Sequence, residues 1–377
     1  MSKTQKHTKP NVPNLRFPGC DGEWEKHTLG EVGEPYIGLT YSPADVVSEG
    51  GVIVFRSSNI QNGEIDYSDI VRVEKRIKDT LRTRKDDLLI CARNGSPRLI
   101  GKNALLGEED ANQTFGAFML VFRSKDNHFI HQLLSTKSYY SQVSENLGAR
   151  INQITTANIK DFEFSFPVSK SERDKIASLL DMIDQRISIQ SRVIERYESL
   201  IKALACEIIG KHQPNVLLTD IVSSTSSTLK ESDLSETGDI PAYGAAGLSG
   251  YTDHCLSERD SILITKDGSG VGSLRYVSGR HSFVGTLNSL IPKEGVYLPY
   301  VYYALFHVNF ETYRTGQAIP HIYFKDYGKE ALYCPVYEEQ IRLAKGLELI
   351  NERTEHEITV LRGLQTIKAY LVSALFI

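Results

Sequence analysis

The chain has 377 residues, enough for two or three domains at roughly 100 to 200 residues each. Hydrophobic residues make up 41% and charged residues 24%, an ordinary globular composition that excludes a disordered or fibrous chain. The 43 Lys and Arg nearly balance the 47 Asp and Glu, so the net charge gives no sign of a nucleic-acid partner.

The first half begins with a basic, proline-containing segment at 1–19 that lacks the apolar stretch of a secretory signal, and it predicts a flexible arm. Segment 129–147 has the apolar spacing of a helix. From 171 to 209 apolar residues recur at alternating steps of three and four, as in a coiled coil, before Gly210 and Pro214 stop the helix. Short apolar runs bounded by turn residues predict strands, at 52–55, 88–92 and 117–122.

The second half follows the same order. A strand-like run at 261–265 and a helical segment at 297–313 precede a second stretch of heptad spacing, from about 338 to 376. Each long helix would span about 39 residues, roughly 58 Å, which a globular core does not need. No apolar run approaches the ~18 residues of a membrane span, so we expect no membrane partner.

A helix that is apolar along one narrow seam needs a partner, and each long helix is the other's candidate. A closed two-fold arrangement would pair them antiparallel, although separate folds or pairing with another chain remain alternatives. The predicted pairing residues are Leu180, Ile183, Ile187, Ile194, Tyr197, Ile201, Leu204, Ile208, Leu347, Ile350, Leu361, Leu364 and Leu371.

Self-similarity supports this plan, because the globular-plus-helix unit repeats at about 167 residues. DDLLICARNGS (86–96) resembles RDSILITKDGS (259–269), each with an apolar run, a basic residue and a Gly-Ser turn. FSFPV likewise matches LYCPV, and GARINQI resembles GQAIPHI. The expected fold class is α+β, with two globular domains related by an internal repeat and joined by two long antiparallel coiled-coil helices. Its expected segments are a first domain with the arm, a first helix, a second domain and a second helix, at 1–169, 170–210, 211–336 and 337–377.

Sites for chemistry are scarce. The glycine-rich segment 265–272 lacks the Gly-Lys-Ser/Thr ending of a phosphate-binding loop, and a turn is the simpler interpretation. Asp86 and Asp87 are adjacent, which puts them on opposite faces of a strand rather than around one Mg²⁺. The five cysteines are scattered without a CxxC pair, which favours a reducing, cytoplasmic setting. We therefore assign no catalytic and no metal-ligating residue.

A local charge excess is more informative. Segment 71–105 holds ten Lys and Arg against four acids, which is enough to neutralise DNA phosphates, although a solvated surface paired with its own acids is an equal alternative. Forked guanidinium groups read guanine, and Asn or Gln side chains read adenine. The DNA-binding candidates are Arg72, Lys75, Arg76, Arg93, Asn94, Ser96, Arg98, Gln113, Arg150, Lys266, Ser269, Arg275, Arg280, His281, Asn288 and Gln317.

With these motifs in place, the layout resembles the specificity subunit of type I restriction-modification systems over essentially the whole chain. The resemblance lies in the doubled globular-plus-helix unit, in GQAIPHIYFKDYGKEALYCPVYEEQ (316–340), whose Pro-x-x-x-Glu-Gln pattern leads into the helix, and in DIPAYGAAGLSGY (239–251). The first repeat departs from the pattern, because it keeps Glu172 but has Arg173 where Gln340 stands.

The resemblance implies a non-catalytic DNA reader whose two target-recognition domains each recognise one half of a split, asymmetric site in double-stranded DNA. It also implies that the helices set the spacing and dock two methyltransferase subunits, with restriction subunits joining the complex. S-adenosylmethionine, Mg²⁺ and ATP would then be bound by partner chains, which would carry out adenine methylation and ATP-dependent cleavage. Two alternatives are a coiled-coil scaffold without DNA specificity and a nuclease with an unrecognised site.

Overall fold

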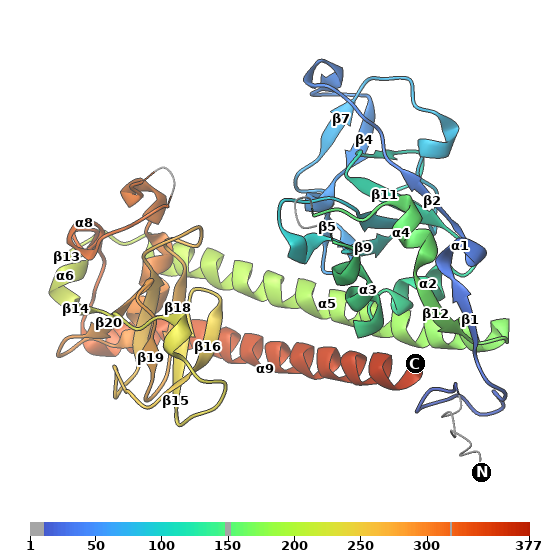
Figure 1. Ribbon diagram of the computed structural model, residues 1–377. Helices are drawn as coiled ribbons and strands as arrows, with labels where there is room; N and C mark the ends of the chain where they lie inside the picture. Colours follow the sequence, from blue (N-terminus) through green and yellow to red (C-terminus); the bar gives the residue numbers. More distant parts are fainter. Residues whose placement is uncertain (1–10, 148–151, 317–318) are drawn as a thin grey trace, which may run out of the picture. The chain divides into compact units, whose positions relative to one another are not determined.

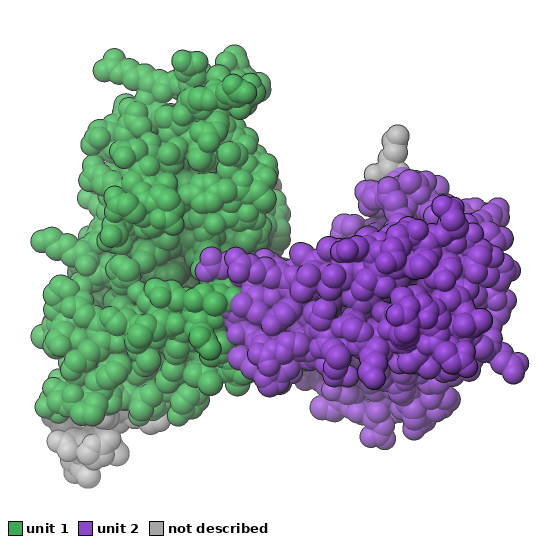
Figure 2. Space-filling model, turned by 180° about the vertical axis from the view of Figure 1, so that it is seen from behind, with its two compact units in different colours: residues 1–189, 361–377 green, residues 190–360 purple. Residues whose placement is uncertain are grey.

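The computed structural model describes residues 11–147, 152–316 and 319–377 (Figure 1). It divides into two compact units, residues 1–189 with 361–377 and residues 190–360 (Figure 2). The two long helices are α5 (Lys170–Ile209) and α9 (Tyr337–Leu375), and each contributes one part to each unit. None of the helices in the described ranges combines the length and the hydropathy that a bilayer crossing requires.

The first unit is a mixed α+β structure. Its helices besides the long ones are α1 (Leu29–Val32), α2 (Asn127–Leu133), α3 (Lys137–Asn146) and α4 (Thr156–Asp161). Its strands are β1 (Glu25–Thr28), β2 (Glu34–Ile37), β3 (Val46–Val47), β4 (Val52–Phe55), β5 (Ile60–Gln61), β6 (Glu64–Ile65), β7 (Val71–Val73), β8 (Leu88–Cys91), β9 (Asn103–Leu105), β10 (Thr114–Phe115), β11 (Met119–Arg123) and β12 (Glu163–Phe166).

The second unit repeats this arrangement with other side chains. Its shorter helices are α6 (Leu218–Ile221), α7 (Leu298–Ala304) and α8 (Phe324–Tyr327). Its strands are β13 (Val216–Leu217), β14 (Val222–Ser226), β15 (Ile240–Gly244), β16 (Gly247–Thr252), β17 (Ser261–Thr265), β18 (Leu274–Val277), β19 (Ser282–Phe283), β20 (Leu287–Pro292) and β21 (Ala331–Leu332).

The internal repeat is visible in the order of the strands. The first unit has a four-stranded sheet in the order β2-β11-β8-β9, and the second has one in the order β14-β20-β17-β18, with every neighbouring pair antiparallel. A two-stranded sheet closes each unit, β1-β12 in one and β13-β21 in the other. Each unit also has one parallel pair, β4 with β10 and β15 with β19. The predicted repeat and fold class are confirmed.

The backbone hydrogen bonds correct the alignment of the two repeats by one residue. Arg93 and the residue before it donate their N–H groups to the carbonyl oxygen of Phe118, at 3.0 and 2.9 Å. In the second unit Asp267 and Lys266 donate in the same way to Thr286, at 3.3 and 2.9 Å. Arg93 therefore corresponds to Asp267, not to the basic Lys266 that the letters of the sequence align with it.

Within each unit, the long helices run antiparallel. In the first unit, Leu180 of α5 shares a core with Val372 and Leu375 near the end of α9. In the second unit, the Nε2 of Gln190 donates to the Oε2 of Glu357 at 2.5 Å, and the two residues are 167 positions apart, the length of the repeat. A residue that contacts its own repeat equivalent is the mark of two-fold, antiparallel pairing. Such a buried polar pair also fixes the register of the helices.

The burial along the helices follows the heptad spacing. Every one of the 13 predicted pairing residues is buried or half-buried, including Leu180 and Leu347. Other apolar residues of the same helices stay exposed, among them Met182 and Leu349. Gly210 ends α5 where the ring of His307 approaches so closely that a Cβ would lie 1.8 Å from it. The narrow seam thus buries one face of each helix and leaves the opposite face free.

Both long helices begin on the same hydrogen bond, although the residue that makes it differs. Gln340 donates from its Nε2 to the carbonyl of Pro335 at 2.8 Å and accepts from the backbone N–H of Tyr297 at 2.8 Å. Arg173 donates from its Nη1 to the carbonyl of Pro167 at 2.6 Å. The replacement of glutamine by arginine in the first repeat therefore keeps the contact to the proline carbonyl.

The prediction of a free N-terminal arm is wrong for the part that the structure describes. Leu15 donates its backbone N–H to the carbonyl of Ala374 in α9 at 2.8 Å. Arg16 forms two hydrogen bonds with the buried carboxylate of Glu172, at 2.7 and 2.8 Å. Trp24, 3% exposed, then joins the core of the first unit. Long-range partners, which the local sequence does not show, hold this segment in place; residues 1–10 lie outside the described ranges.

Candidate nucleic-acid interface

Arg93 lies two residues after the end of β8 and is an exposed cation of the predicted patch. Its side chain has a defined orientation. Its guanidinium lies over the ring of Phe118, 4.8 Å from the ring centroid. Phe118 is 55% exposed, although the apolar run around it forms a buried strand. Among the described residues, the Arg93 side chain forms no ion pair, so its donors are free for a ligand.

Amide side chains hold the turn that follows Arg93. Asn94 donates from Nδ2 to the hydroxyl of Ser57 at 2.9 Å and accepts from the backbone N–H of Ser96 at 3.0 Å. Asn152 donates to the carbonyl of Gly95 at 2.9 Å. The amide of Asn94, a predicted DNA contact, thus holds the turn. These hydrogen bonds tie the turn that follows Arg93 to Ser57 and Asn152.

The repeat-equivalent turn of the second unit has different chemistry. Asp267 lies 2.7 Å from the Nδ1 of His321 and also pairs with Lys266. The ring of Tyr323 stacks near His321 with an interplanar angle of 21°, and the ammonium of Lys325 lies 5.3 Å from the Tyr323 centroid. Burial raises the pKa of Asp267, but hydrogen bonds from the imidazole and from Lys266 outweigh it and leave that pKa below its ordinary value.

The charge patch at 71–105 divides into paired and unpaired cations. Lys75 pairs with Asp45 at 3.1 Å, and Arg72 donates to the carbonyl of Gly50 at 3.5 Å. Arg84 and Lys85 also pair with acids on the surface. For this part of the patch, the ion pairs support the alternative of a solvated surface paired with its own acids. Within the described residues, the cations of this patch whose side chains form neither an ion pair nor a hydrogen bond are Arg76, Lys78, Arg93, Arg98 and Lys102.

Three other predicted DNA contacts are occupied by structural roles. His281 is fully buried, and its Nε2 lies 2.8 Å from the hydroxyl of Ser261; burial lowers its pKa. Asn288 is 4% exposed and accepts a hydrogen bond from Ser226. Gln113 accepts from a backbone N–H of β4 at 2.8 Å. Burial and internal partners leave His281 and Asn288 unable to reach a duplex, so these two assignments are corrected. Gln113 is half-buried with its oxygen bonded to β4, and its assignment stays a prediction.

The remaining candidates fall into two groups. Arg280 is exposed and pairs with Glu258 at 2.8 Å, whereas Ser269 and Arg275 are exposed on the second unit. Arg150 and Gln317 lie outside the described residues. The sequence analysis did not single out Phe118, because this residue belongs to an apolar run that is typical of a strand along its whole length. The stacked rings of His321 and Tyr323 were not predicted either.

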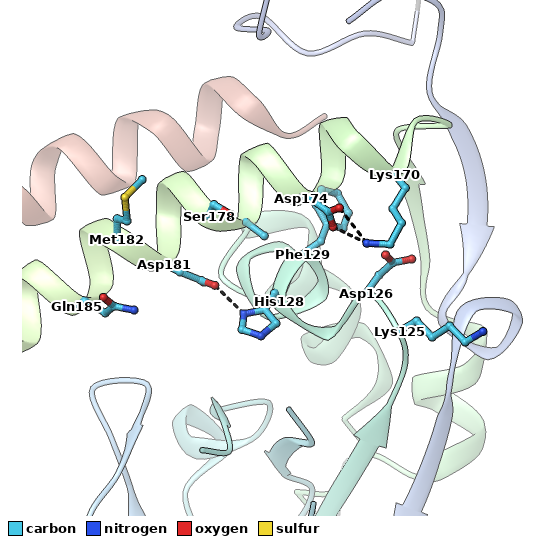
Figure 3. Close-up of a pocket in the computed structure, with 11 residues that line it drawn as sticks. Lys125, Asp126, His128, Phe129, Lys170, Asp174, Ser178, Asp181, Met182 and Gln185 are labelled. Carbon is cyan, nitrogen blue, oxygen red and sulfur yellow. Dashed lines mark hydrogen bonds and ion pairs between the residues drawn. The ribbon is translucent and has the colours of Figure 1, made fainter. Parts of the chain in front are cut away.

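The cavity in Figure 3 does not resemble a catalytic site. It has a volume of about 480 Å³ and lies between α2 and the first turns of α5. His128 points toward Asp181, 2.7 Å away, and Lys170 pairs with Asp174 in its own helix. The lining mixes two lysines with the carboxylates of three aspartates, which does not suit a phosphate group. Across the described ranges, no group of three or more His, Cys, Asp or Glu is placed to hold a metal ion.

Comparison with known proteins agrees with the repeat and the fold. A model of the type I restriction modification DNA specificity domain matches residues 21–198 and again residues 215–361. The type I restriction enzyme StySPI specificity subunit of Salmonella potsdam is 25% identical over 197 residues, 50% of this chain and 42% of that protein. The EcoKI specificity subunit of Escherichia coli is 26% identical over 181 residues, 46% of this chain and 39% of that protein.

This chain therefore spans less than half of the length of those two relatives. In fold it is similar to the crystal structure of a type I restriction-modification system S subunit from M. genitalium, with a TM-score of 0.62, 21% identity and coverage of 97% of this chain and 99% of that one. Because the family model matches both repeats, the chain belongs to the family of type I restriction modification DNA specificity domains.

Proposed function

We propose that this chain is the DNA-reading specificity subunit of a type I restriction-modification complex. Each globular domain would read one half of a bipartite, asymmetric site. The observation that carries the proposal is the pair of repeat-equivalent turns, which share one hydrogen-bonded backbone but present Arg93 in one unit and Asp267 in the other. A common frame with different side chains suits two half-sites of different sequence.

The exposed faces of the long helices support a second part of the proposal, the docking of two methyltransferase subunits. Met182 and Leu349 occupy equivalent places in the two repeats and are 60% and 61% exposed. Leu200 and Ile367 form another equivalent pair, 43% and 51% exposed. Two matching apolar surfaces suit two copies of one partner, because repeat-related surfaces present the same chemistry twice.

The catalytic work would belong to the partners. Methyltransferase subunits would bind S-adenosylmethionine and methylate adenine, and restriction subunits would supply ATP- and Mg²⁺-dependent cleavage. The chain itself would contribute DNA specificity and spacing, in the cytoplasm where the DNA lies. The coiled-coil scaffold is the contrasting hypothesis.

The test is to co-express the chain with its methyltransferase in a host that lacks DNA methylation and to map methylated adenines across the genome. A split, asymmetric motif that depends on the chain is expected. Binding of the complex to a duplex with that motif should weaken steeply as salt rises, since phosphate contacts release counterions. A stable complex without any motif, or with binding insensitive to salt, would instead support the scaffold hypothesis.

A further inference from the structure

We propose that Phe118 is a specificity residue of the first globular domain. It holds the Arg93 guanidinium for the acceptor edge of a guanine and places its own ring against the thymine methyl group of a neighbouring base pair. This inference rests on the proposed function, because it assigns the bases that one of the two domains reads. It predicts adjacent G·C and A·T pairs in one half-site.

The backbone around Phe118 is fixed before any ligand binds. Its carbonyl oxygen accepts two hydrogen bonds, from the N–H groups of Ala92 and Arg93 at 2.9 and 3.0 Å. The next residue, Met119, is fully buried in β11 and pairs with Cys91 of β8. Phe118 thus lies in the turn directly before β11 and Arg93 lies two residues after β8, at the ends of two adjacent, hydrogen-bonded strands.

The contact between the two side chains orients the arginine. The guanidinium carbon lies 4.8 Å from the ring centroid, within the range of an attractive cation–π contact. A long side chain held in one direction loses less conformational entropy when it binds. A guanidinium presents two parallel donors, which match the O6 and N7 acceptors of guanine in the major groove.

The ring has a second role because more than half of it remains exposed. Phe118 is 55% exposed, and Arg93, whose guanidinium lies over the ring, is exposed as well. An apolar side chain in the major groove has one base-specific partner, the C5 methyl group of thymine. Since the arginine lies on the ring, the two contacts must fall on neighbouring base pairs.

The second domain has neither the aromatic ring nor the arginine at the equivalent positions. Thr286 stands where Phe118 stands, and Asp267 stands where Arg93 stands. A carboxylate accepts hydrogen bonds from base amino groups and repels the acceptor edge of guanine. The pair is therefore specific to one half-site, which makes the second domain an internal control.

The experiment uses the complex of this chain with its methyltransferase and a duplex that carries the mapped motif. In one duplex 7-deazaguanine replaces the guanine and removes N7; in another, deoxyuridine replaces the neighbouring thymine and removes the methyl group. We expect each to weaken binding of the unaltered complex by about tenfold, the loss of one base contact. Phe118→Ala should bind the thymine and uracil duplexes equally, and Arg93→Ala should no longer respond to 7-deazaguanine. Phe118→Leu keeps an apolar side chain and should keep the response to the methyl group.

The matched control is Thr286→Ala, which should leave the response at this half-site unchanged. Because Phe118 is largely exposed, its variants should melt at the temperature of the unaltered chain. A half-site without adjacent G·C and A·T pairs would overturn the inference, as would an unchanged response to uracil in Phe118→Ala. Uniformly weaker binding of all duplexes by Arg93→Ala, with a shallower salt dependence, would make Arg93 a phosphate contact and overturn it too. If the unaltered complex shows no motif at all, the proposed function fails first, and that result is distinct.

Discussion

The two globular domains have the same backbone plan and different side chains where the plan meets the surface. In both domains a turn follows the third strand in the order of the four-stranded sheet, which is β8 in one and β17 in the other. Two successive backbone N–H groups after that strand donate to one carbonyl oxygen. One turn presents a cation on an aromatic ring, Arg93 on Phe118, and the other presents Asp267 paired with His321. The two repeats therefore share the backbone hydrogen bonds of this turn and differ in the side chains that the turn presents.

The short helices α2 and α7, which pack against the long helices, also differ between the units in their side chains. In the first unit α2 presents His128 and His131, whereas α7 of the second unit presents Tyr300 and Tyr303. Both tyrosines are buried, and burial raises their pKa values above the ordinary value for tyrosine. At these positions α2 therefore carries two imidazoles, whereas α7 carries two phenols, which stay protonated at neutral and mildly acidic pH.

The largest expected effect tests what the repeats share, the buried helix seam. Leu180→Ala and Leu347→Ala should each lower the free energy of unfolding by roughly 2 to 5 kcal/mol, because both residues are at most 1% exposed and leave a cavity. Urea unfolding measures this, with the fluorescence of Trp24 reporting on the first unit. Met182→Ala, on the free face, is the matched control and should change stability by less than about 0.5 kcal/mol. Similar losses for buried and exposed positions would contradict the assigned seam.

The first turns of the long helices, where the two repeats differ, should give the next largest effect. Gln340→Ala leaves the backbone N–H of Tyr297 without its partner and should cost about 1 to 3 kcal/mol. Arg173→Gln imitates the second repeat; it keeps the bond to the proline carbonyl and loses the contacts to Asp126 and to the carbonyl of Val168, each at 3.3 Å. Its cost should stay below about 1 kcal/mol, measured by urea unfolding. A larger loss for Arg173→Gln than for Gln340→Ala would refute the equivalence of the two helix starts.

The pH dependence should separate the units. Burial lowers the pKa of His131 to about 4, so its neutral form stabilises the first unit, and this stability is lost as pH falls from about 6.5 toward 4. By pH 4 the loss should reach about 3 kcal/mol, since each unit of pKa shift corresponds to about 1.4 kcal/mol. The hydrogen bond to Asp181 raises the pKa of His128, whose smaller contribution is present below about pH 6.5 and disappears as pH rises through the raised pKa.

Trp24-monitored unfolding between pH 7 and pH 4 tests this assignment of the two histidines. His131→Phe should remove most of the loss of stability on acidification, whereas His128→Gln should retain it. An identical pH profile for His131→Phe and the unaltered chain would mean that another group is responsible.

The smallest effect on the chain itself is expected on the outer faces of the helices. Met182→Asp and Leu349→Asp should leave stability nearly unchanged, since both side chains are about 60% exposed. Each should weaken one methyltransferase site by roughly tenfold, as a charge placed in an apolar contact does. Analytical ultracentrifugation would show weaker methyltransferase binding at one of two sites for either single variant and at both sites for the double variant. Unchanged affinity at both sites in the double variant would place the docking surface elsewhere.

The long helices and the repeat were predictable because heptad spacing and duplicated motifs are local signals. The exact alignment of the two repeats could not be predicted from the sequence. The Gly-Ser pairs that follow Arg93 and Lys266 favour aligning these two residues, whereas the backbone hydrogen bonds shift the alignment by one residue. His281 looked like an exposed base reader, yet it lies in the core and binds Ser261. Burial and long-range partners of this kind, like the bond from Arg16 to Glu172, depend on the tertiary structure and leave no periodic trace.

The most direct test of the central claim is a methylation map from complexes in which one reading turn at a time is altered. Arg93→Ala should relax the motif in one half and leave the other half intact, and Asp267→Asn should do the reverse, while the spacing between the halves stays constant. If either variant relaxes both halves together, or changes only the spacing, the two domains do not read separate half-sites and the central claim is wrong.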